Sequence, residues 1–206
     1  MLLRHRHGHR DVGRFDEWAA TYDDHWLQRR LFDPVQQLVV DTAARYRPDA
    51  TAILDVGCGT GRLLRKTRQA FPHARLVGVD AAAGMIDAAR RKADDIEFVQ
   101  GTAESLAFPD GSFDLVVTTL SFHHWDAQRE GLRQVHRVMR PGALFLLNDL
   151  VLQSWMVPFA TIARARDRTH TLLEFRTLLH GAGFIPLRAI SVPRFAHGLY
   201  VMAARC

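Results

Sequence analysis

The stretch from residue 53 to residue 61 has the composition of a ligand-binding turn. It reads Ile-Leu-Asp-Val-Gly-Cys-Gly-Thr-Gly, an apolar run that ends in alternating glycines. Glycine lacks a Cβ atom, so the chain can turn sharply there and lie against a bound molecule. Asp80 ends the next apolar run, about twenty residues later, where doubly wound folds place a carboxylate on ribose hydroxyls. The turn and the acid together predict a nucleoside ligand.

The glycine spacing narrows the choice of nucleoside. A dinucleotide-binding turn has the pattern G-x-G-x-x-G, whereas residues 57–61 have G-x-G-x-G. The phosphate-binding pattern G-x-x-x-x-G-K-[ST] does not follow either. A second group, His123, His124 and Trp125, comes directly after an apolar run. Imidazole takes up protons near neutral pH, so these histidines are candidates for acid–base chemistry.

Apolar runs that alternate with helical patterns must position these residues. The spacing predicts strands at residues 51–56, 76–79, 96–99, 113–120 and 143–147. It predicts helices at residues 62–71, 81–92, 127–139 and 171–180. Two further strands are predicted within 181–192 and 197–204. In an open parallel sheet, ligands bind outside the carboxyl ends of the strands. The glycine turn, Asp80 and the histidine pair all fall at such ends.

Length and composition predict one domain. The chain has 206 residues, of which 48% are hydrophobic, so a single core can form without staples. Two cysteines, Cys58 and Cys206, make no disulfide framework, which favours a reducing compartment. The N-terminus has no secretory apolar region, and the most apolar stretch, 143–160, carries polar residues and a proline. We therefore expect a cytoplasmic protein without a membrane span.

The positive charge is concentrated at the N-terminus. The net charge is +5, and residues 1–14 contribute +3 of it. We interpret residues 1–14 as a disordered basic tail and residues 15–206 as the domain. Aromatic residues at helical spacing predict a helical cap over 15–47, beginning with a helix at 15–27, and the irregular segment 148–170 is predicted to face a substrate. His5, His7 and His9 lack further ligands, so no metal site is predicted.

Four stretches together resemble a known family. Residues 53–61, 77–80, 101–104 and 137–142 are similar to successive motifs of class I S-adenosylmethionine-dependent methyltransferases. The resemblance is to the small-molecule branch typified by ubiquinone and menaquinone biosynthesis enzymes, and it extends from about residue 15 to residue 147. It implies an α/β fold: a Rossmann-like, mostly parallel seven-stranded sheet with helices on both faces, an antiparallel last strand and an N-terminal helical cap.

The resemblance also implies the site. The cofactor-binding residues would be Tyr22, Asp55, Gly57, Cys58, Gly59, Asp80, Ala81, Met85, Thr102, Ala103, Leu120 and Ser121. Thr102 stands where the family commonly has an aspartate, so adenine recognition would depend more on the Ala103 backbone and on packing. The substrate-binding residues would be Trp26, His123, Trp125 and Trp155, and the catalytic base would be His124. His123 is the second candidate base, and packing remains the alternative role of the histidine pair.

The expected reaction is methyl transfer from S-adenosyl-L-methionine to a small-molecule acceptor by in-line displacement, leaving S-adenosyl-L-homocysteine. The protein's main contribution would then be placement of the reacting atoms. An RNA-directed methyltransferase and a catalytically inactive cofactor-binding module are the alternatives. Nucleic acid is the less expected partner, because 119–125 contains no proline and base-directed enzymes carry an Asn/Asp-Pro-Pro-aromatic stretch there. A short-chain dehydrogenase would need a Tyr-x-x-x-Lys pair, which the chain lacks.

Overall fold

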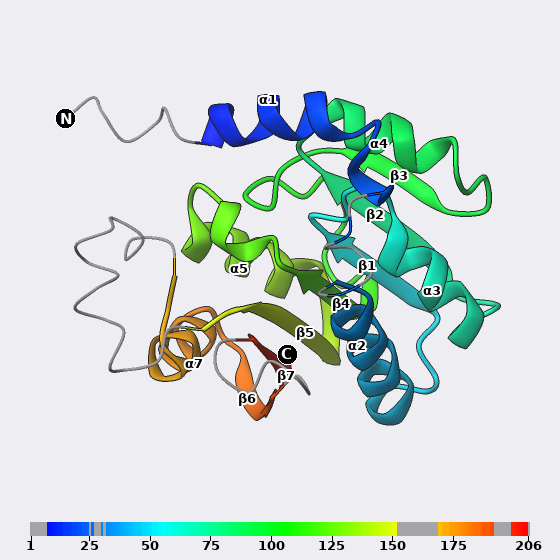
Figure 1. The fold of residues 1–206 in the computed structure, drawn as a ribbon. Coiled ribbons are helices and arrows are strands. Elements are labelled where there is room, and N and C mark those ends of the chain that lie inside the picture. The colour runs from blue at the N-terminus through cyan, green and yellow to red at the C-terminus, as the bar shows by residue number, and fades with distance from the viewer. Residues whose placement is uncertain are drawn as a thin grey trace.

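A computed structural model describes residues 8–24, 26, 30, 32–151, 169–191 and 199–205. Its described strands form one seven-stranded sheet in the order β3-β2-β1-β4-β5-β7-β6 (Figure 1). The strands are β1 (Ala52–Val56), β2 (Arg75–Asp80), β3 (Glu97–Gln100), β4 (Phe113–Thr119), β5 (Met139–Leu150), β6 (Ile185–Ser191) and β7 (Leu199–Arg205). Strands β1 to β5 pair in parallel, and β7 is antiparallel to both of its neighbours. The expected Rossmann-like α/β fold is confirmed.

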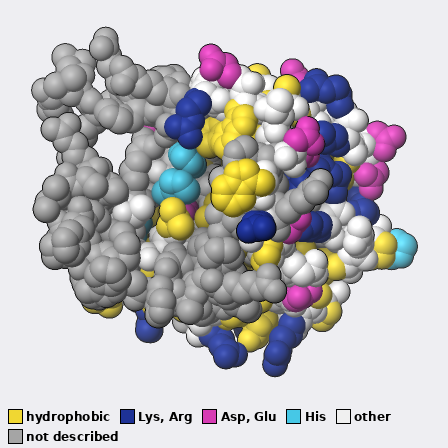
Figure 2. All heavy atoms as spheres, in the orientation of Figure 1, with side chains coloured by type: hydrophobic (Ala, Val, Ile, Leu, Met, Phe, Trp, Pro, Cys, Tyr) yellow, Lys and Arg dark blue, Asp and Glu magenta, His cyan; other side chains and the backbone are white. Residues whose placement is uncertain are grey.

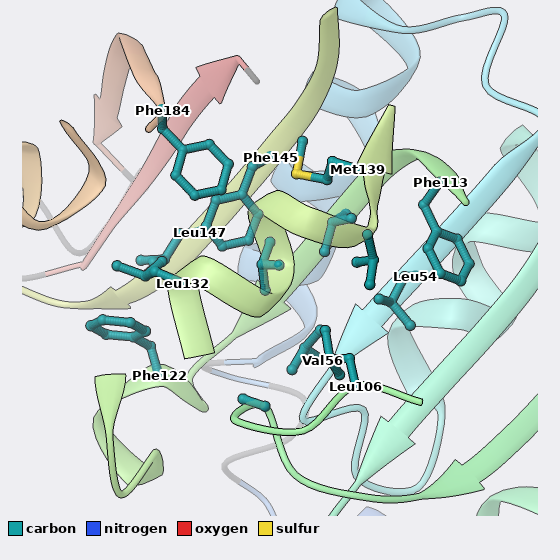
Figure 3. Close-up of a cluster of buried hydrophobic side chains, with 14 of the residues drawn as sticks. Leu54, Val56, Leu106, Phe113, Phe122, Leu132, Met139, Phe145, Leu147 and Phe184 are labelled. Carbon is teal, nitrogen blue, oxygen red and sulfur yellow. The ribbon is translucent and has the colours of Figure 1, made fainter. Parts of the chain in front are cut away.

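Helices cover both faces of this sheet. They are α1 (Gly8–Trp18), α2 (Asp33–Tyr46), α3 (Arg62–Ala70), α4 (Ala83–Arg90), α5 (Gln128–Val138) and α7 (Leu172–Gly181), with short 3-10 turns η1 (Tyr22–Asp24) and η3 (Phe122–His124). One core contains residues of α2, α3 and α4, and the other contains residues of α5 and α7. Figure 3 shows Leu54 and Val56 of β1 in the second core, together with Phe145 of β5 and Phe184. None of the helices within the described ranges has the length and apolarity that a membrane crossing requires.

The strand order places a ligand site at the middle of the sheet. The chain runs from β1 outward to β2 and β3, then returns to β4 on the other side of β1. Adjacent connections therefore leave in opposite directions, which opens a crevice at the carboxyl ends of β1 and β4. The glycine turn follows β1, and η3 follows β4. The fold thus brings together the two groups of residues that were predicted to carry chemistry.

The predicted disordered tail is wrong for residues 8–14, because α1 begins at Gly8. The side chains of Val12 and Phe15 pack with Ala19 against Ala82, which precedes α4, and Met85 of α4. A buried apolar contact of this kind stabilises a helix whose own sequence is mostly polar. The predicted helix over 15–27 ends earlier, at Trp18. Within the predicted cap 15–47, α2 belongs to the core that also contains α3 and α4. The segment that packs beside Ala82 and Met85 starts before residue 15, at Gly8; residues 1–7 lie outside the described part.

Candidate active site

A cavity lies at the carboxyl ends of β1, β2 and β4. Its wall is formed by the glycine turn, the start of α4, the loop after β3, η3 and the N-terminal cap. The predicted site residues that line it are Tyr22, Gly57, Gly59, Asp80, Ala81, Met85, Thr102, Ala103, Leu120, Ser121, His124 and Trp125. The structure therefore brings most of the predicted residues to one cavity, while their binding roles stay predictions.

The glycine turn combines close packing with an open face. Gly57 has a φ of 77°, and a Cβ atom there would lie 1.8 Å from the Ser121 Oγ atom. Gly59 has a φ of 53°, and a Cβ atom there would meet nothing within 4 Å. Gly61 packs instead against the ring of Phe98, at 2.7 Å from the position of its missing Cβ atom. A side chain at position 57 would therefore collide with Ser121, whereas Gly59 leaves free space beside the main chain.

Asp80 presents its carboxylate to the cavity between two backbone donors. The Gly59 N–H donates to Asp80 Oδ2 at 2.8 Å, and the Ala82 N–H donates to Oδ1 at 2.9 Å. Burial raises the pKa of Asp80, although these N–H groups act in the opposite direction. Each carboxylate oxygen can accept a further hydrogen bond. Asp80 is thus held in place by the glycine turn and remains able to accept hydroxyl groups of a ligand.

Asp55 and Cys58 point away from the cavity. Ile53 belongs to the core that contains α2 and α3, and side chains two residues apart on a strand share a face, so Asp55 points there too. Asp55 is 1% exposed, and its Oδ1 atom has no hydrogen-bond partner among the described residues. Burial, and then the charge of Asp80, raise its pKa to about 8. Cys58 packs in the same core, so neither side chain lines the cavity, and the predicted cofactor-binding role of the two residues stays a prediction.

The part of the cavity wall that contains Met85, Thr102 and Ala103 is partly apolar. Met85 is 2% exposed and lies on the first turn of α4, and it lines the same cavity as Thr102 and Ala103. Ala103 is buried, and Thr102 is exposed with its side chain at the cavity. An apolar wall with a few polar groups is the usual composition of a small-molecule pocket. Thr102 thus lies at the cavity, and its role as acceptor for the adenine amino group stays a prediction.

A strained residue forms the transition from β4 to η3. Leu120 has a φ of 51°, the positive value that non-glycine residues rarely adopt. Its conformation turns the chain so that Leu120 and Ser121 both line the cavity. The Ser121 Oγ atom accepts a hydrogen bond of 3.3 Å from the indole Nε1–H of Trp125. This bond holds the 7%-exposed Trp125 ring against the cavity wall.

The two histidines of η3 have different surroundings. His124 lines the cavity, and its ring meets the Phe15 ring edge-on, with centroids 5.1 Å apart. His123 does not line the cavity; its ring lies 4.0 Å from that of His124, and its Nδ1 atom lies 2.7 Å from Asp149 Oδ1. The geometry therefore places the first candidate base at the cavity and the second one behind it.

The cap is fixed to the domain by charged groups. Asp23 of η1 accepts hydrogen bonds from Thr60, from Arg65 of α3 and from Lys92, at 2.5, 3.2 and 2.7 Å. Burial raises the pKa of Asp23, but the hydrogen bonds and the positive charges of Lys92 and Arg65 outweigh it and lower the pKa. Asp16 of α1 accepts from the Gly84 N–H at 2.7 Å. These bonds hold Phe15 and Tyr22 over the cavity.

Some predicted residues lie elsewhere, and some lining residues were missed. Trp26 is 62% exposed and away from the cavity, and Trp155 lies outside the described residues, as does most of the predicted substrate-facing segment 148–170. The lining residues that the sequence analysis did not assign are Val12, Phe15, Val56, Val79, Ala82, Gly101, Glu104, Thr119 and Asp126. Most of them adjoin a predicted residue, so the adjacent positions were the available signal. Val12 had no such signal, because it fell in the predicted tail. Phe15 was the first residue of the aromatic pattern that predicted the helical cap, but it was given no site role.

The described surface carries charges of both signs. On the face shown in Figure 2, Lys and Arg side chains and Asp and Glu side chains both occur over the described residues. The cavity itself is lined by Asp80, Glu104 and Asp126 and by no described lysine or arginine. Within the described ranges, no three His, Cys, Asp or Glu side chains are grouped to hold a metal ion. The cavity is therefore suited to a ligand that carries positive charge.

Comparison with known proteins identifies the same family. Residues 53–142 match the model of the methyltransferase domain. A demethylmenaquinone methyltransferase from Chlorobaculum tepidum is 35% identical over 133 residues, which cover 62% of this chain and 54% of that protein. A malonyl-[acyl-carrier protein] O-methyltransferase from Dechloromonas aromatica is 31% identical over 189 residues, which cover 89% of this chain and 68% of that protein. The chain thus spans only about half the length of some of the curated relatives that it matches.

The solved structures agree on the fold. A structure described as an S-adenosylmethionine-dependent methyltransferase from Aquifex aeolicus superposes with a TM-score of 0.73 at 18% sequence identity. The superposition covers 92% of this chain and 97% of that one, so the two share the fold over most of their length. The extent of the match to the Dechloromonas aromatica protein, together with the domain match across the glycine turn, Asp80 and η3, decides the family. The chain belongs to the class I S-adenosylmethionine-dependent methyltransferases.

Proposed function

We propose that this protein transfers the methyl group of S-adenosyl-L-methionine to a small organic acceptor by in-line displacement. The observation that carries the proposal is the cavity in which Gly59 and Asp80 are joined by a 2.8 Å hydrogen bond. The free space beside Gly59 accommodates a ligand close to the main chain. The carboxylate next to it is positioned for the ribose hydroxyls.

The residues at the cavity fit the cofactor part by part. Asp80 would hold the sugar, and Ala81, Met85, Thr102 and Ala103 would surround the base. Gly57, Gly59, Leu120, Ser121 and Tyr22 would border the amino-acid end. The acidic lining without a described basic residue suits a ligand with ammonium and sulfonium charges. Asp55 and Cys58 are proposed to act through the shape of the turn, because their side chains lie on its other side.

The reaction requires placement more than covalent chemistry by the protein. When bound, the cofactor supplies a methyl group that its sulfonium already activates. His124 and Trp125 line the cavity after β4 and would contact the acceptor. His124 is proposed to take the proton of the attacking group, and Phe15 and Trp125 would exclude water from it. His123 is proposed to support the acceptor side from behind His124.

Two features support a small molecule as the acceptor. The relatives are named for demethylmenaquinone and for malonyl-[acyl-carrier protein], and both reactions act on a small organic group. The described face in Figure 2 has charges of both signs interspersed, whereas a nucleic-acid surface is expected to be broadly basic. RNA methylation and cofactor binding without turnover are therefore kept as outcomes of the test.

Calorimetry with S-adenosyl-L-methionine and S-adenosyl-L-homocysteine tests the cofactor site. We expect both to bind the wild-type protein and to bind the Asp80→Asn variant at least tenfold more weakly. Asp110→Asn is the control, because Asp110 is 80% exposed and pairs with Arg137 away from the cavity. Wild-type protein that binds neither compound at high micromolar concentration would refute the proposal.

An acceptor screen tests the transfer itself. Release of S-adenosyl-L-homocysteine is measured with quinols, phenols, fatty acids and bulk RNA as separate acceptors. We expect product with at least one small organic acceptor and none with RNA. Turnover with RNA alone would replace the proposed acceptor class, and tight cofactor binding without any product would identify a binding module.

A further inference from the structure

Asp149 is a buried carboxylate at the carboxyl end of β5 that the sequence analysis did not assign to the site. It is 1% exposed. Its Oδ2 atom accepts the His123 backbone N–H at 2.8 Å, and its Oδ1 atom accepts the Leu150 N–H at 2.7 Å. The ring Nδ1 atom of His123 lies 2.7 Å from Oδ1. One carboxylate thus holds both the main chain and the side chain of His123.

These contacts assign the tautomer of His123. The two backbone N–H groups can only donate, so both carboxylate oxygens act as acceptors. An ionised carboxylate accepts and cannot donate, so the hydrogen of the third contact belongs to Nδ1 of His123. The hydrogen bond at one ring nitrogen sets the state of the other. In the neutral ring, Nε2 of His123 therefore carries the lone pair.

Asp149 acts on the cavity through the turn η3. His123 and His124 are consecutive in this three-residue turn, and their rings lie 4.0 Å apart at an angle of 43°. Fixing the backbone and ring of His123 therefore fixes the position of His124 as well. From the other side, the ring of Phe15 packs edge-on against His124. His124 is thus held between α1 and a histidine that Asp149 anchors.

Acidic side chains share the cavity with His124. The carboxylates of Asp80, Glu104 and Asp126 line the same cavity, and Asp149 holds the ring of the adjacent His123. No lysine or arginine among the described residues lines this cavity. A positive charge that develops there during the reaction would be stabilised by these surroundings.

We propose that Asp149 is a positioning residue for removal of the acceptor's proton. This inference rests on the proposed methyl transfer. With a hydroxyl acceptor, the O–H bond breaks and its proton goes to the ring of His124. The oxygen forms a bond to the methyl carbon, and the carbon–sulfur bond breaks with its electron pair remaining on sulfur. Asp149, acting through His123, keeps His124 aligned and offsets its new charge.

Nuclear magnetic resonance of the histidine rings tests the arrangement without any acceptor. In the wild-type protein we expect His123 to be protonated at Nδ1 and unprotonated at Nε2. In the Asp149→Asn variant we expect the preference for this tautomer to weaken, because the asparagine amide can present either its oxygen or its N–H group to Nδ1 of His123. Asp110→Asn makes the same change far from the cavity and should leave the tautomer of His123 as in the wild type. An unchanged tautomer preference in Asp149→Asn, or the opposite tautomer in the wild type, would overturn the inference.

Kinetics with catechol and hydroquinone as hydroxyl probes test the consequence. We expect Asp149→Asn to lower kcat about tenfold or more, with the KM for the probe and the affinity for S-adenosyl-L-methionine within about twofold of wild type. The loss should shrink as the pH rises from about 6 to about 9, because the probe then ionises without help. His123→Asn, which keeps a donor towards Asp149, should retain more activity than His123→Ala.

The two proposals fail in different ways. Absence of cofactor binding in the wild-type protein contradicts the methyl-transfer proposal. Wild-type turnover of a hydroxyl probe together with an equally active, equally stable Asp149→Asn variant contradicts only the role of Asp149. Thermal unfolding of Asp149→Asn and of the wild type separates loss of the fold from loss of proton transfer. We expect Asp149→Asn to remain folded, because the amide oxygen of asparagine can still accept the His123 backbone N–H.

Discussion

The replacement of Asp55 by asparagine should change how the stability of the protein depends on pH. Asp55 is 1% exposed, and its Oδ1 atom has no hydrogen-bond partner among the described residues. Burial and the nearby charge of Asp80 raise its pKa from 3.8 to about 8. Asparagine keeps the size and shape of the protonated side chain and does not titrate. The variant therefore isolates the contribution of this one proton.

The expected magnitude follows from the two pKa values of Asp55. Between pH 3.8 and about 8, the folded protein retains a proton that the unfolded chain has released. The Asp55 contribution to the free energy of unfolding is therefore fully present below pH 3.8, and it is lost as the pH rises towards 8. The slope is about 1.4 kcal/mol per pH unit, so the change from pH 5 to pH 7 amounts to about 3 kcal/mol. The free energy of unfolding of Asp55→Asn, relative to that of the wild type, should therefore rise by about 3 kcal/mol from pH 5 to pH 7.

Urea unfolding of the cofactor-free proteins at pH 5, 6 and 7, followed by circular dichroism, measures this difference. Asp110→Asn serves as the control, because Asp110 is 80% exposed and its replacement should leave the pH dependence nearly unchanged. If the stabilities of Asp55→Asn and the wild type run parallel across this interval, Asp55 is ionised in the folded protein. The assignment of the proton to Asp55 would then be wrong.

Three further substitutions probe the cavity directly. Asp80→Asn should weaken cofactor binding by about 1.5–3 kcal/mol, because a charged acceptor for the ribose hydroxyls is lost. If calorimetry finds equal affinity for the variant and the wild type, the ribose does not bind at Asp80. Gly57→Ala should cost more stability than Gly59→Ala in urea unfolding, because its Cβ atom would lie 2.4 Å from the Ser121 Cβ atom whereas the space beside Gly59 is open. His124→Ala should leave cofactor affinity nearly intact and lower turnover about a hundredfold, and normal turnover in a product assay would remove the base role.

The glycine turn and Asp80 could be located from the sequence because local rules fix them. Strand, turn and helix follow one another within a few residues, and the carboxyl ends of parallel strands meet at one edge. The rules did not fix which way each side chain points. Asp55 and Cys58 belong to the same motif as Gly57 and Gly59, yet their side chains lie in the core behind the turn. A motif match names the segment, and the direction of each side chain depends on the packing.

The parts that the sequence analysis missed depend on distant contacts. Asp149 meets His123 across 26 positions of the chain, and nothing local to either residue indicates the pair. Likewise, α1 carries few apolar residues and is ordered by its contact with Ala82 and Met85. Local propensity is a weak predictor for such a helix, because tertiary packing supplies most of its stability. The boundaries of the predicted tail were wrong for this reason.

The contribution of α1 to the cavity has a practical consequence for protein preparation. Val12 and Phe15 belong to the wall of the cavity, although their segment has the composition of a dispensable leader. Trimming the gene to begin near residue 20 would uncover Met85 and open this part of the cavity to water. Such a shortened protein could fold and still be a poor binder, and an inactive preparation would then be mistaken for an inactive enzyme. Purification tags are therefore better joined to the opposite terminus.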